Sequence, residues 1–337
     1  MDESDAQDTD IQNAVGKQEA RQDKNTGRSR SSNGMEILTV SEYMKRKYGQ
    51  KVYRLSLSSG CTCPNRDGTL GWSGCAFCSA GGSGDFASEL APLEEQIAAA
   101  KRRVDPKIPA SIRPEDRKYI AYFQSYTNTY GDTERLRRLY TAAITRPEIV
   151  TLSVGTRPDC LEPDKVEMLE QLNRIKPVWV ELGLQTIHEK TAEAFHREYS
   201  LPAFLDAYHR LKEAGLEVIV HVILGLPGES REDMLDTVRF LAGLQPSLDG
   251  IKLQLLHILK GTEYGAQFQN NPTPFQASGF TLDSYCDLVV DCLKLLPPGT
   301  VIHRLTGDGP KRLLLAPLWS ADKKRVLNML NRRIREA

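Results

Sequence analysis

Three of the seven cysteines in this 337-residue chain constrain it more than any other feature. Cys63, Cys75 and Cys78 follow the pattern C-x11-C-x2-C, in a loop rich in glycine and polar residues. Three thiolates can bind three irons of a [4Fe–4S] cube, whereas the four thiolates of an electron-transfer ferredoxin bind all of them. A three-cysteine site leaves one iron open, and an open metal position is where chemistry takes place.

A zinc site is the main competing interpretation. Structural zinc takes four ligands, usually as two close pairs, and Cys61 would supply a fourth thiolate beside Cys63. Cys160, Cys286 and Cys292 are scattered through apolar stretches, where cysteine usually acts as a small buried hydrophobe. The spacing favours the cluster over zinc and leaves both open.

Composition narrows the class of protein. The chain is 40% hydrophobic and 26% charged, which suffices for one large domain or two ordinary ones. It contains no apolar run of about 18 residues and no apolar signal segment near its start, so we expect a cytoplasmic protein without disulfides.

Charge is balanced overall but locally uneven. The formal net charge is zero, which gives no global signature of nucleic-acid binding. From His303 to Ala337, however, nine Lys or Arg residues face three acids, and a second basic stretch runs from Lys101 to Lys118. Such patches bind phosphate backbones or form solvated helix faces.

The chain divides into three parts by pattern. Residues 1–34 are polar without apolar periodicity and are predicted to be disordered. Residues 35–260 alternate short apolar runs with amphipathic stretches, and residues 261–337 form a basic C-terminal extension that we consider for RNA contact. The predicted strands are Val52–Ser58, Tyr119–Phe123, Val150–Val154, Val178–Leu184, Glu217–Leu224 and Gly250–Leu256. The predicted helices are Leu93–Arg103, Thr133–Thr145, Pro163–Lys176, Glu189–His196, Pro202–Ala214 and Ser230–Leu244.

This alternation predicts an α/β fold with parallel strands, either a partial barrel or an open doubly wound sheet. In both, the active site lies at the carboxyl ends of the strands. Polar residues and turns gather at these ends or inside the strands: Gln124, Thr127, Asn128, Glu181, Gln185, His221, Gly225, Pro227, Gly228 and His257. Glu181, His221 and His257 are the candidate catalytic residues, and the pattern assigns none of them as acid or base.

Several segments together resemble the radical S-adenosylmethionine (SAM) superfamily, and most closely its bacterial YhcC/YtqA (MnmL-like) family, which is related to the radical-SAM half of the elongator catalytic subunit. The resemblance covers about residues 36–330 and implies a TIM-like partial (β/α)6 barrel with a short C-terminal extension. The matching segments are 63–69, 74–78, 122–130, 155–159, 181–186, 225–229 and 304–310.

The resemblance implies a mechanism. Cys63, Cys75 and Cys78 would ligate a [4Fe–4S] cluster whose open iron chelates SAM, and reductive cleavage of SAM would release methionine and a 5′-deoxyadenosyl radical. A reducing partner such as flavodoxin or ferredoxin would supply the electron. The residues expected around SAM are Phe77, Gln124, Thr127, Asn128, Gln185, Arg197, Gly225, Pro227 and Gly228.

The resemblance also suggests a substrate. Members of this branch are linked to modification of the wobble uridine of tRNA, here at a carboxymethylaminomethyl side chain, and the basic C-terminal segment is compatible with tRNA binding. The alternatives are a radical SAM enzyme that acts on a small metabolite or a protein, and a non-catalytic four-cysteine zinc module.

Overall fold

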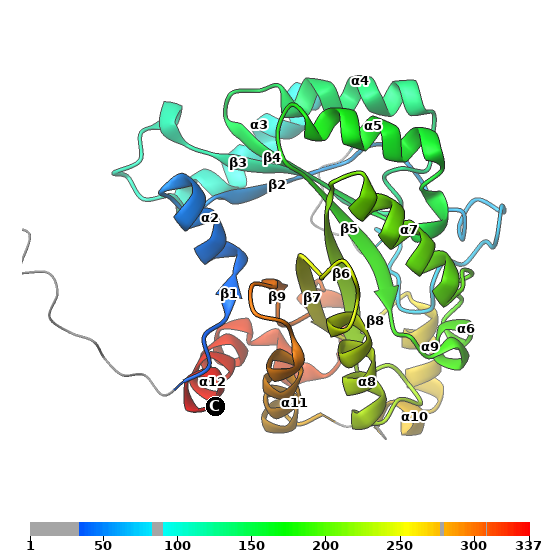
Figure 1. Cartoon of the computed structure of the whole chain (residues 1–337). Helices are drawn as coiled ribbons and strands as arrows, with labels where there is room; N and C mark the ends of the chain where they lie inside the picture. Colours follow the sequence, from blue (N-terminus) through cyan, green and yellow to red (C-terminus); the bar gives the residue numbers. More distant parts are fainter. Residues whose placement is uncertain (1–33, 83–89, 277–279, 308) are drawn as a thin grey trace, which may run out of the picture.

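The computed structural model describes residues 34–82, 90–276, 280–307 and 309–337. The tail predicted to be disordered lies outside these residues, apart from its last position. Within them the chain forms an eight-stranded sheet of order β1-β9-β7-β6-β5-β4-β3-β2, in which every neighbouring pair is parallel (Figure 1). The α/β fold with parallel strands, curled into a partial barrel, is therefore confirmed.

The elements follow one another along the chain as strand and helix. The strands are β1 Leu38–Thr39, β2 Tyr53–Leu57, β3 Tyr119–Phe123, β4 Ile149–Thr156, β5 Val178–Gln185, β6 Glu217–Leu224, β7 Gly250–Leu255, β8 Ile258–Leu259, β9 Val301–Arg304 and β10 Leu314–Ala316. The helices are α2 Val40–Tyr48, α3 Leu93–Val104, α4 Thr133–Ile144, α5 Pro163–Asn173, α6 Glu189–Ala194, α7 Leu201–Glu213, α8 Arg231–Ala242, α9 Glu263–Asn270, α10 Thr273–Gln276, α11 Leu282–Leu295 and α12 Lys323–Glu336.

All six predicted strands are present as β2 to β7, with ends that shift by two residues at most. The helices between them cover the outer side of the curved sheet (Figure 1). Strands β4, β5 and β6 are buried along nearly their whole length, as expected for parallel strands that are covered on both faces.

Helix α2 covers part of the inner face of the sheet. Met44 of this helix is 1% exposed and belongs to an apolar cluster with Trp179 of β5 and Ile219 of β6. Because the strands are parallel, all their carboxyl ends lie at the same edge of the barrel, and the functional site is expected at this edge.

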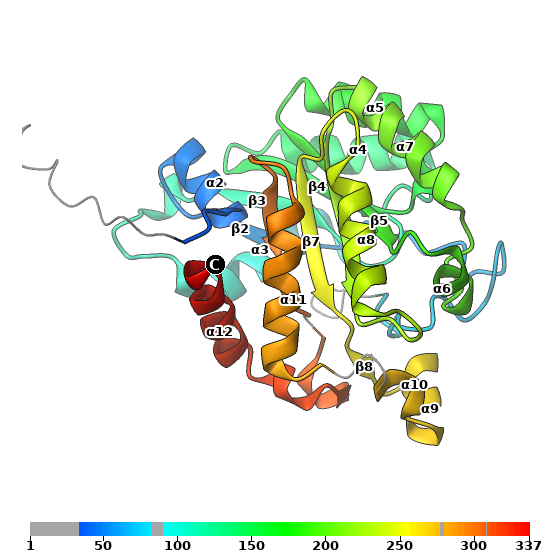
Figure 2. The ribbon, with the colours of Figure 1, turned by 60° about the horizontal axis from the view of Figure 1, so that its bottom comes forward.

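The C-terminal residues rejoin the barrel. Strand β9 pairs with β7 on one side and β1 on the other, so part of the extension predicted to begin at 261 belongs to the main sheet. Helix α12 lies beside α11 (Figure 2) and buries Val326, Leu330 and Ile334. Among the described residues, no helix is long and apolar enough to cross a membrane.

Candidate functional site

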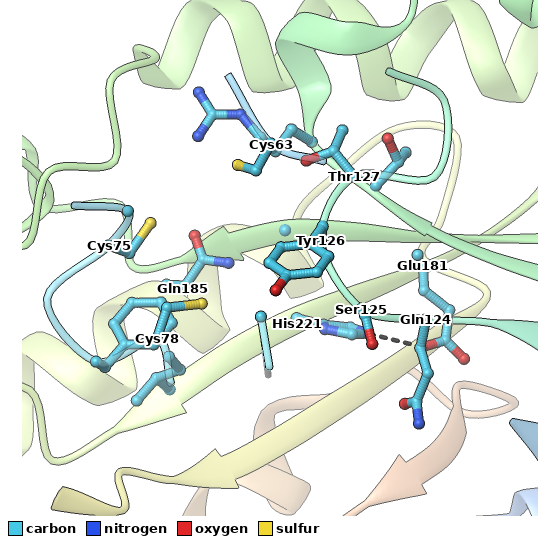
Figure 3. A pocket seen from close by; sticks show the side chains of 18 of the residues that line it. Cys63, Cys75, Cys78, Gln124, Ser125, Tyr126, Thr127, Glu181, Gln185 and His221 are labelled. Atoms are coloured by element: carbon cyan, nitrogen blue, oxygen red, sulfur yellow. Dashed lines mark hydrogen bonds and ion pairs between the residues drawn. The ribbon is translucent and has the colours of Figure 1, made fainter. Parts of the chain in front are cut away.

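A pocket opens at the carboxyl ends of the strands and contains all three cysteines of the motif. In the view of Figure 3, the cysteines lie at one end of the pocket and Glu181 and Gln124 at the other. The described residues that line it are Cys63, Arg66, Gly74, Cys75, Phe77, Cys78, Gly82, Tyr122, Gln124, Ser125, Tyr126, Thr127, Gly155, Thr156, Arg157, Glu181, Gly183, Gln185, Tyr199, His221, Ile223, Lys252, Gln254 and Arg304.

The cysteine loop is held by its own backbone and by Arg66. The amide of Arg66 donates to the Cys63 carbonyl and the amide of Cys78 to the Cys75 carbonyl, each at 2.8 Å. The Arg66 guanidinium donates to the carbonyls of Cys78 at 3.0 Å and Ser79 at 2.8 Å. Gly74 has a φ of 76°, and a Cβ there would lie 2.5 Å from Arg66 Nε. Glycine here adopts the left-handed φ without strain and leaves room for the Arg66 side chain where it crosses the loop.

Cys61 is separated from the other three cysteines by its surroundings. It does not line the pocket, and its sulfur accepts a hydrogen bond from Arg135 Nη2 at 3.3 Å. In the described part of the chain, no three His, Cys, Asp or Glu side chains are close enough together to hold one metal ion. The contact of Cys61 with Arg135 does not favour the four-cysteine zinc alternative, which needs Cys61 as the fourth ligand of a single centre.

The three remaining thiols suit a cluster better than a single ion, because in a cluster each thiolate binds a different iron. Burial, together with the neighbouring charges of Cys78 and Cys63, raises the pKa of Cys75 to about 12. A thiolate at Cys75 therefore needs a positive centre beside it to stabilise it. Asn65 Nδ2 lies 3.7 Å from the Cys75 sulfur and adds a donor beside it.

Strained backbone surrounds the same pocket. Ser125, Tyr126 and Gln185 have φ values of 73°, 58° and 66°, in the left-handed region that residues with a Cβ seldom adopt. All three line the pocket. Strain of this kind costs of order 1–3 kcal/mol per residue and gathers at functional sites, where the surrounding structure enforces it.

A buried charged group lies at the floor of the pocket. Glu181 of β5 accepts hydrogen bonds from Ser153 Oγ at 3.0 Å, from His221 Nε2 at 2.9 Å and from Lys252 Nζ. Lys252 Nζ also lies 3.2 Å from the Tyr122 hydroxyl oxygen. Glu181 and Lys252 are each 1% exposed, so this ion pair is almost completely removed from water.

The charges of this group shift its pKa values. Burial would raise the pKa of Glu181, but Lys252 and His221 outweigh it and hold the pKa well below its usual range. Burial, opposed by Glu181, lowers the pKa of Lys252 to about 7. Burial and the Lys252 charge lower the pKa of His221 to about 4. At neutral pH, Glu181 is therefore ionised and His221 neutral.

Most of the predicted site residues meet in the pocket. The cysteines are joined there by Phe77, Gln124, Thr127, Glu181, Gln185 and His221. Asn128 and Arg197 do not line it. The Asn128 side chain donates to the Gly155 carbonyl at 2.8 Å and accepts from Ser59 Oγ at 2.6 Å, which fixes the loop after β3.

Arg197 is engaged by the protein itself. Its guanidinium donates to the carbonyls of Leu184, Thr186 and Tyr199 and pairs with Glu189 at 2.8 Å. This side chain is 1% exposed and holds the end of β5 in place. Its placement does not favour the predicted contact with SAM.

The turn after β6 and His257 also lie outside this pocket. Gly225, Pro227 and Gly228 are not among the lining residues, although Ile223 at the end of β6 is. His257 lines a second pocket, where its Nδ1 accepts from the Gly309 amide at 3.0 Å. The two pockets adjoin, because they share Phe77, Ile223, Gln254 and Arg304.

Sequence reasoning missed Lys252, Tyr199 and the pocket position of Arg157. The Tyr199 hydroxyl lies 3.0 Å from Gln185 Oε1, and its ring lies 4.9 Å from the Arg157 guanidinium carbon. Arg157 in turn makes a bidentate ion pair with Asp159 at 2.7 and 2.9 Å. Lys252 did leave a signal, since a lysine inside an apolar strand has to be paired when it is buried.

Comparison with known proteins adds to this geometry. Residues 58–241 match the model of the radical SAM superfamily, and residues 248–336 match the radical SAM C-terminal domain. YtqA of Bacillus subtilis is 40% identical over 88% of this chain and 88% of its own length. YhcC of Escherichia coli is 34% identical over 87% of this chain and 90% of its own length.

A solved structure has the same fold. Elp3 of the archaeon Methanocaldococcus infernus aligns with a TM-score of 0.56 at 18% identity, over 68% of this chain and 58% of that one. At this level of identity the likeness concerns the fold alone.

Proposed function

Because this chain belongs to the radical SAM superfamily, we propose that it is an enzyme that reductively cleaves SAM at a [4Fe–4S] cluster bound by Cys63, Cys75 and Cys78. The observation that carries the proposal is that these three cysteines line one pocket, while Cys61 is held outside it by Arg135. When bound, the cluster and SAM would supply one-electron cleavage of the sulfonium group.

The chain's own residues would bind, orient and exclude water. Phe77 stands between two of the cysteines and packs edge-on against Phe195, with ring centroids 5.3 Å apart, which makes an apolar wall. Gln185 is fixed by Tyr199, so its amide is preorganised toward the pocket. Gln124 and Thr127 follow β3 and present polar groups from the strained loop. We assign these residues to the SAM side of the pocket.

We propose tRNA as the substrate, with the wobble-uridine side chain as the group that enters the pocket. A series of adjoining pockets supports this proposal. The second pocket shares His257, Gly307 and Gly309 with a third pocket. The lining of this third pocket includes Lys311, Arg312 and Lys323. A polyanion bound to these cations would therefore lie beside an entrance to the site.

The second basic stretch is much less suited to RNA. Lys101 pairs with Glu148 at 2.7 Å, Arg117 with Asp105 at 3.1 Å, and Arg113 with neighbouring acids. These ion pairs involve three of the seven Lys or Arg residues between Lys101 and Lys118. Lys311, Arg312 and Lys324 take part in no ion pair with the other described residues. The C-terminal segment thus offers the stronger field to a phosphate backbone.

The test of SAM cleavage is formation of 5′-deoxyadenosine by anaerobically reconstituted protein with SAM and a reductant. The control is the triple variant Cys63→Ala, Cys75→Ala, Cys78→Ala. We expect product from the wild type alone, and then a change in a wobble nucleoside when tRNA from cells that lack the protein is added. Bound zinc without a cluster would support the binding-module alternative. Cleavage of SAM without any change in tRNA would point to a metabolite or protein substrate.

A further inference from the structure

The floor of the pocket contains more positive than negative charge. Among the described residues that line the pocket, Glu181 is the one acidic side chain. It pairs with Lys252, and Arg54 Nη2 lies 3.9 Å from its Oε1. While Lys252 is protonated, two cations thus share one carboxylate. His221 and His303 do not offset this charge, because each is neutral at neutral pH. Burial lowers the pKa of both imidazoles.

This floor also has donors without acceptors. Lys252 has three N–H groups, of which Glu181 and Tyr122 take two. No other acceptor for Lys252 is found in the described part of the chain. Arg54 does not itself line the pocket; it donates to His303 Nδ1 at 2.8 Å, and its buried Nε has no partner in the described part of the chain. Buried donors are normally satisfied, so a site with spare donors and surplus positive charge is suited to an anion.

We propose that Lys252, oriented by Glu181 and Tyr122, binds an anionic group of the substrate, a carboxylate or a phosphate, at the floor of the pocket. The proposal rests on the proposed function only in taking this pocket as the place where the substrate reacts. Lys252 lines the pocket with 1% of its surface exposed, so its ammonium is itself largely removed from water. A charge-assisted hydrogen bond there is stronger than one at the surface.

The electrostatics agree with this assignment. The groups that face Lys252 are Arg54, Tyr122, Glu181, His221, His303 and Arg304. Burial, together with the charges of Arg304 and Arg54, makes it costly to keep Lys252 protonated, although Glu181 opposes them. An added anion would reverse that cost. Binding of the anion should therefore be accompanied by retention of the Lys252 proton.

A direct binding experiment uses small probes rather than the substrate. The reconstituted protein is titrated with acetate, with inorganic phosphate and with acetamide at constant ionic strength, and its melting temperature is recorded. A ligand that binds the folded state alone raises the melting temperature with concentration. We expect acetate or phosphate to do so and acetamide, which has the shape of acetate without its charge, to have no effect.

Variants locate the response. Lys252→Met should abolish the rise with anions, and Lys252→Arg should retain it. Since Lys252→Met leaves Glu181 without its main partner, the double variant with Glu181→Gln removes both charges and guards against misfolding. Lys165→Met is the matched control, because Lys165 is also buried but binds the Gly131 carbonyl at 2.8 Å away from the pocket. The control should keep the full response.

Three results would overturn the proposal: acetamide acting like acetate, an unchanged response in the Met variants, or no response of the wild type to either anion. Acetate and phosphate compared with each other identify which anion the site takes. These titrations with small probes do not depend on tRNA being the substrate.

A kinetic experiment separates the substrate from SAM, whose own carboxylate is a competing anion. With a tRNA that has a carboxymethylaminomethyl wobble side chain, Lys252→Met should raise the KM for tRNA at least tenfold more than the KM for SAM. An effect on SAM as large as that on tRNA would assign Lys252 to SAM and overturn the proposal. If the wild type responds to the probes and modifies no tRNA, the anion site stands and the proposed substrate is wrong.

Discussion

At the residue scale, two neighbouring cysteines have different surroundings. Cys63 lines the pocket, whereas the Cys61 sulfur accepts a hydrogen bond from Arg135. We expect Cys61→Ala to keep the full iron and sulfide content after reconstitution and Cys63→Ala to lose most of it. Metal analysis and the visible absorbance of the cluster measure both. Equal loss of metal in the two variants would instead support the four-cysteine site.

Gly74 gives a second prediction at this scale. In Gly74→Ala the new Cβ would lie 2.5 Å from Arg66 Nε, and the alanine backbone would have to keep a φ of 76°. We therefore expect the cysteine loop to shift. Backbone strain alone costs about 1–3 kcal/mol of unfolding free energy, and the clash adds to it. Denaturant unfolding and iron retention are the measurements, and both should decrease.

The matched control is Gly215→Ala. Gly215 has a φ of 70°, close to that of Gly74, but a Cβ there would meet nothing within 4 Å. It should cost only the strain of the left-handed conformation, about 1–3 kcal/mol as for Gly74, and leave the iron content unchanged. If the two variants behave alike, the contact with Arg66 has no part in shaping the loop.

At the scale of elements, parallel pairing brings the floor residues together from separate strands. His221 of β6 is directly opposite Lys252 of β7, and Gly183, two residues after Glu181 on β5, is opposite His221. Residues two apart on a strand point to the same face, so Glu181 and its partners share the inner face of the barrel. Three residues far apart in sequence thereby form one charged group.

This group makes stability depend on pH. Burial lowers the pKa of Lys252 to about 7 from 10.5, so between these values the unfolded chain holds a proton that the folded chain has lost. The unfolding free energy should then rise with pH across this window, by a few kcal/mol at most. Urea unfolding from pH 7 to 10 measures the rise, and Lys252→Met should lack it. Parallel curves for the two proteins would contradict the predicted shift.

The sequence predicted the strands of the sheet better than it predicted the contacts of single side chains. Short runs bounded by turns predicted all of β2 to β7, and the inner strands β4, β5 and β6 gave the clearest pattern because burial on both faces leaves a nearly continuous apolar run. Strand β9 has four residues and pairs with β7 and β1 from a distant part of the chain, so no local pattern predicted it. The sequence also did not predict that Arg197 donates to the backbone carbonyls at the end of β5. This contact depends on the path of β5 in space and not on the residues next to Arg197 in the sequence.

At the scale of the whole molecule, the C-terminal segment joins the N-terminal strand β1 to the rest of the sheet. β9 closes the gap between β7 and β1, and α12 then packs on α11 (Figure 2). Arg333 pairs with Asp283 and Asp287 of α11, so it serves this packing and is a poor choice for an RNA-binding variant. Lys324 and Arg325 instead line a shallow surface groove along α12.

The last prediction tests whether the basic residues of the C-terminal segment bind tRNA. In the variant Lys311→Gln, Arg312→Gln, Lys324→Gln, Arg325→Gln, we expect weaker binding and a smaller dependence on salt. Each lost phosphate contact should reduce the slope of log affinity against log salt by roughly one. Filter binding over a range of salt concentrations gives the slope. Lys101→Gln with Arg113→Gln, in the ion-paired basic stretch, should leave the slope unchanged, since those charges are already neutralised by acids. If the four-residue variant kept the wild-type slope, tRNA would have to approach the pocket from another side, and the adjoining pockets would have no part in its recognition.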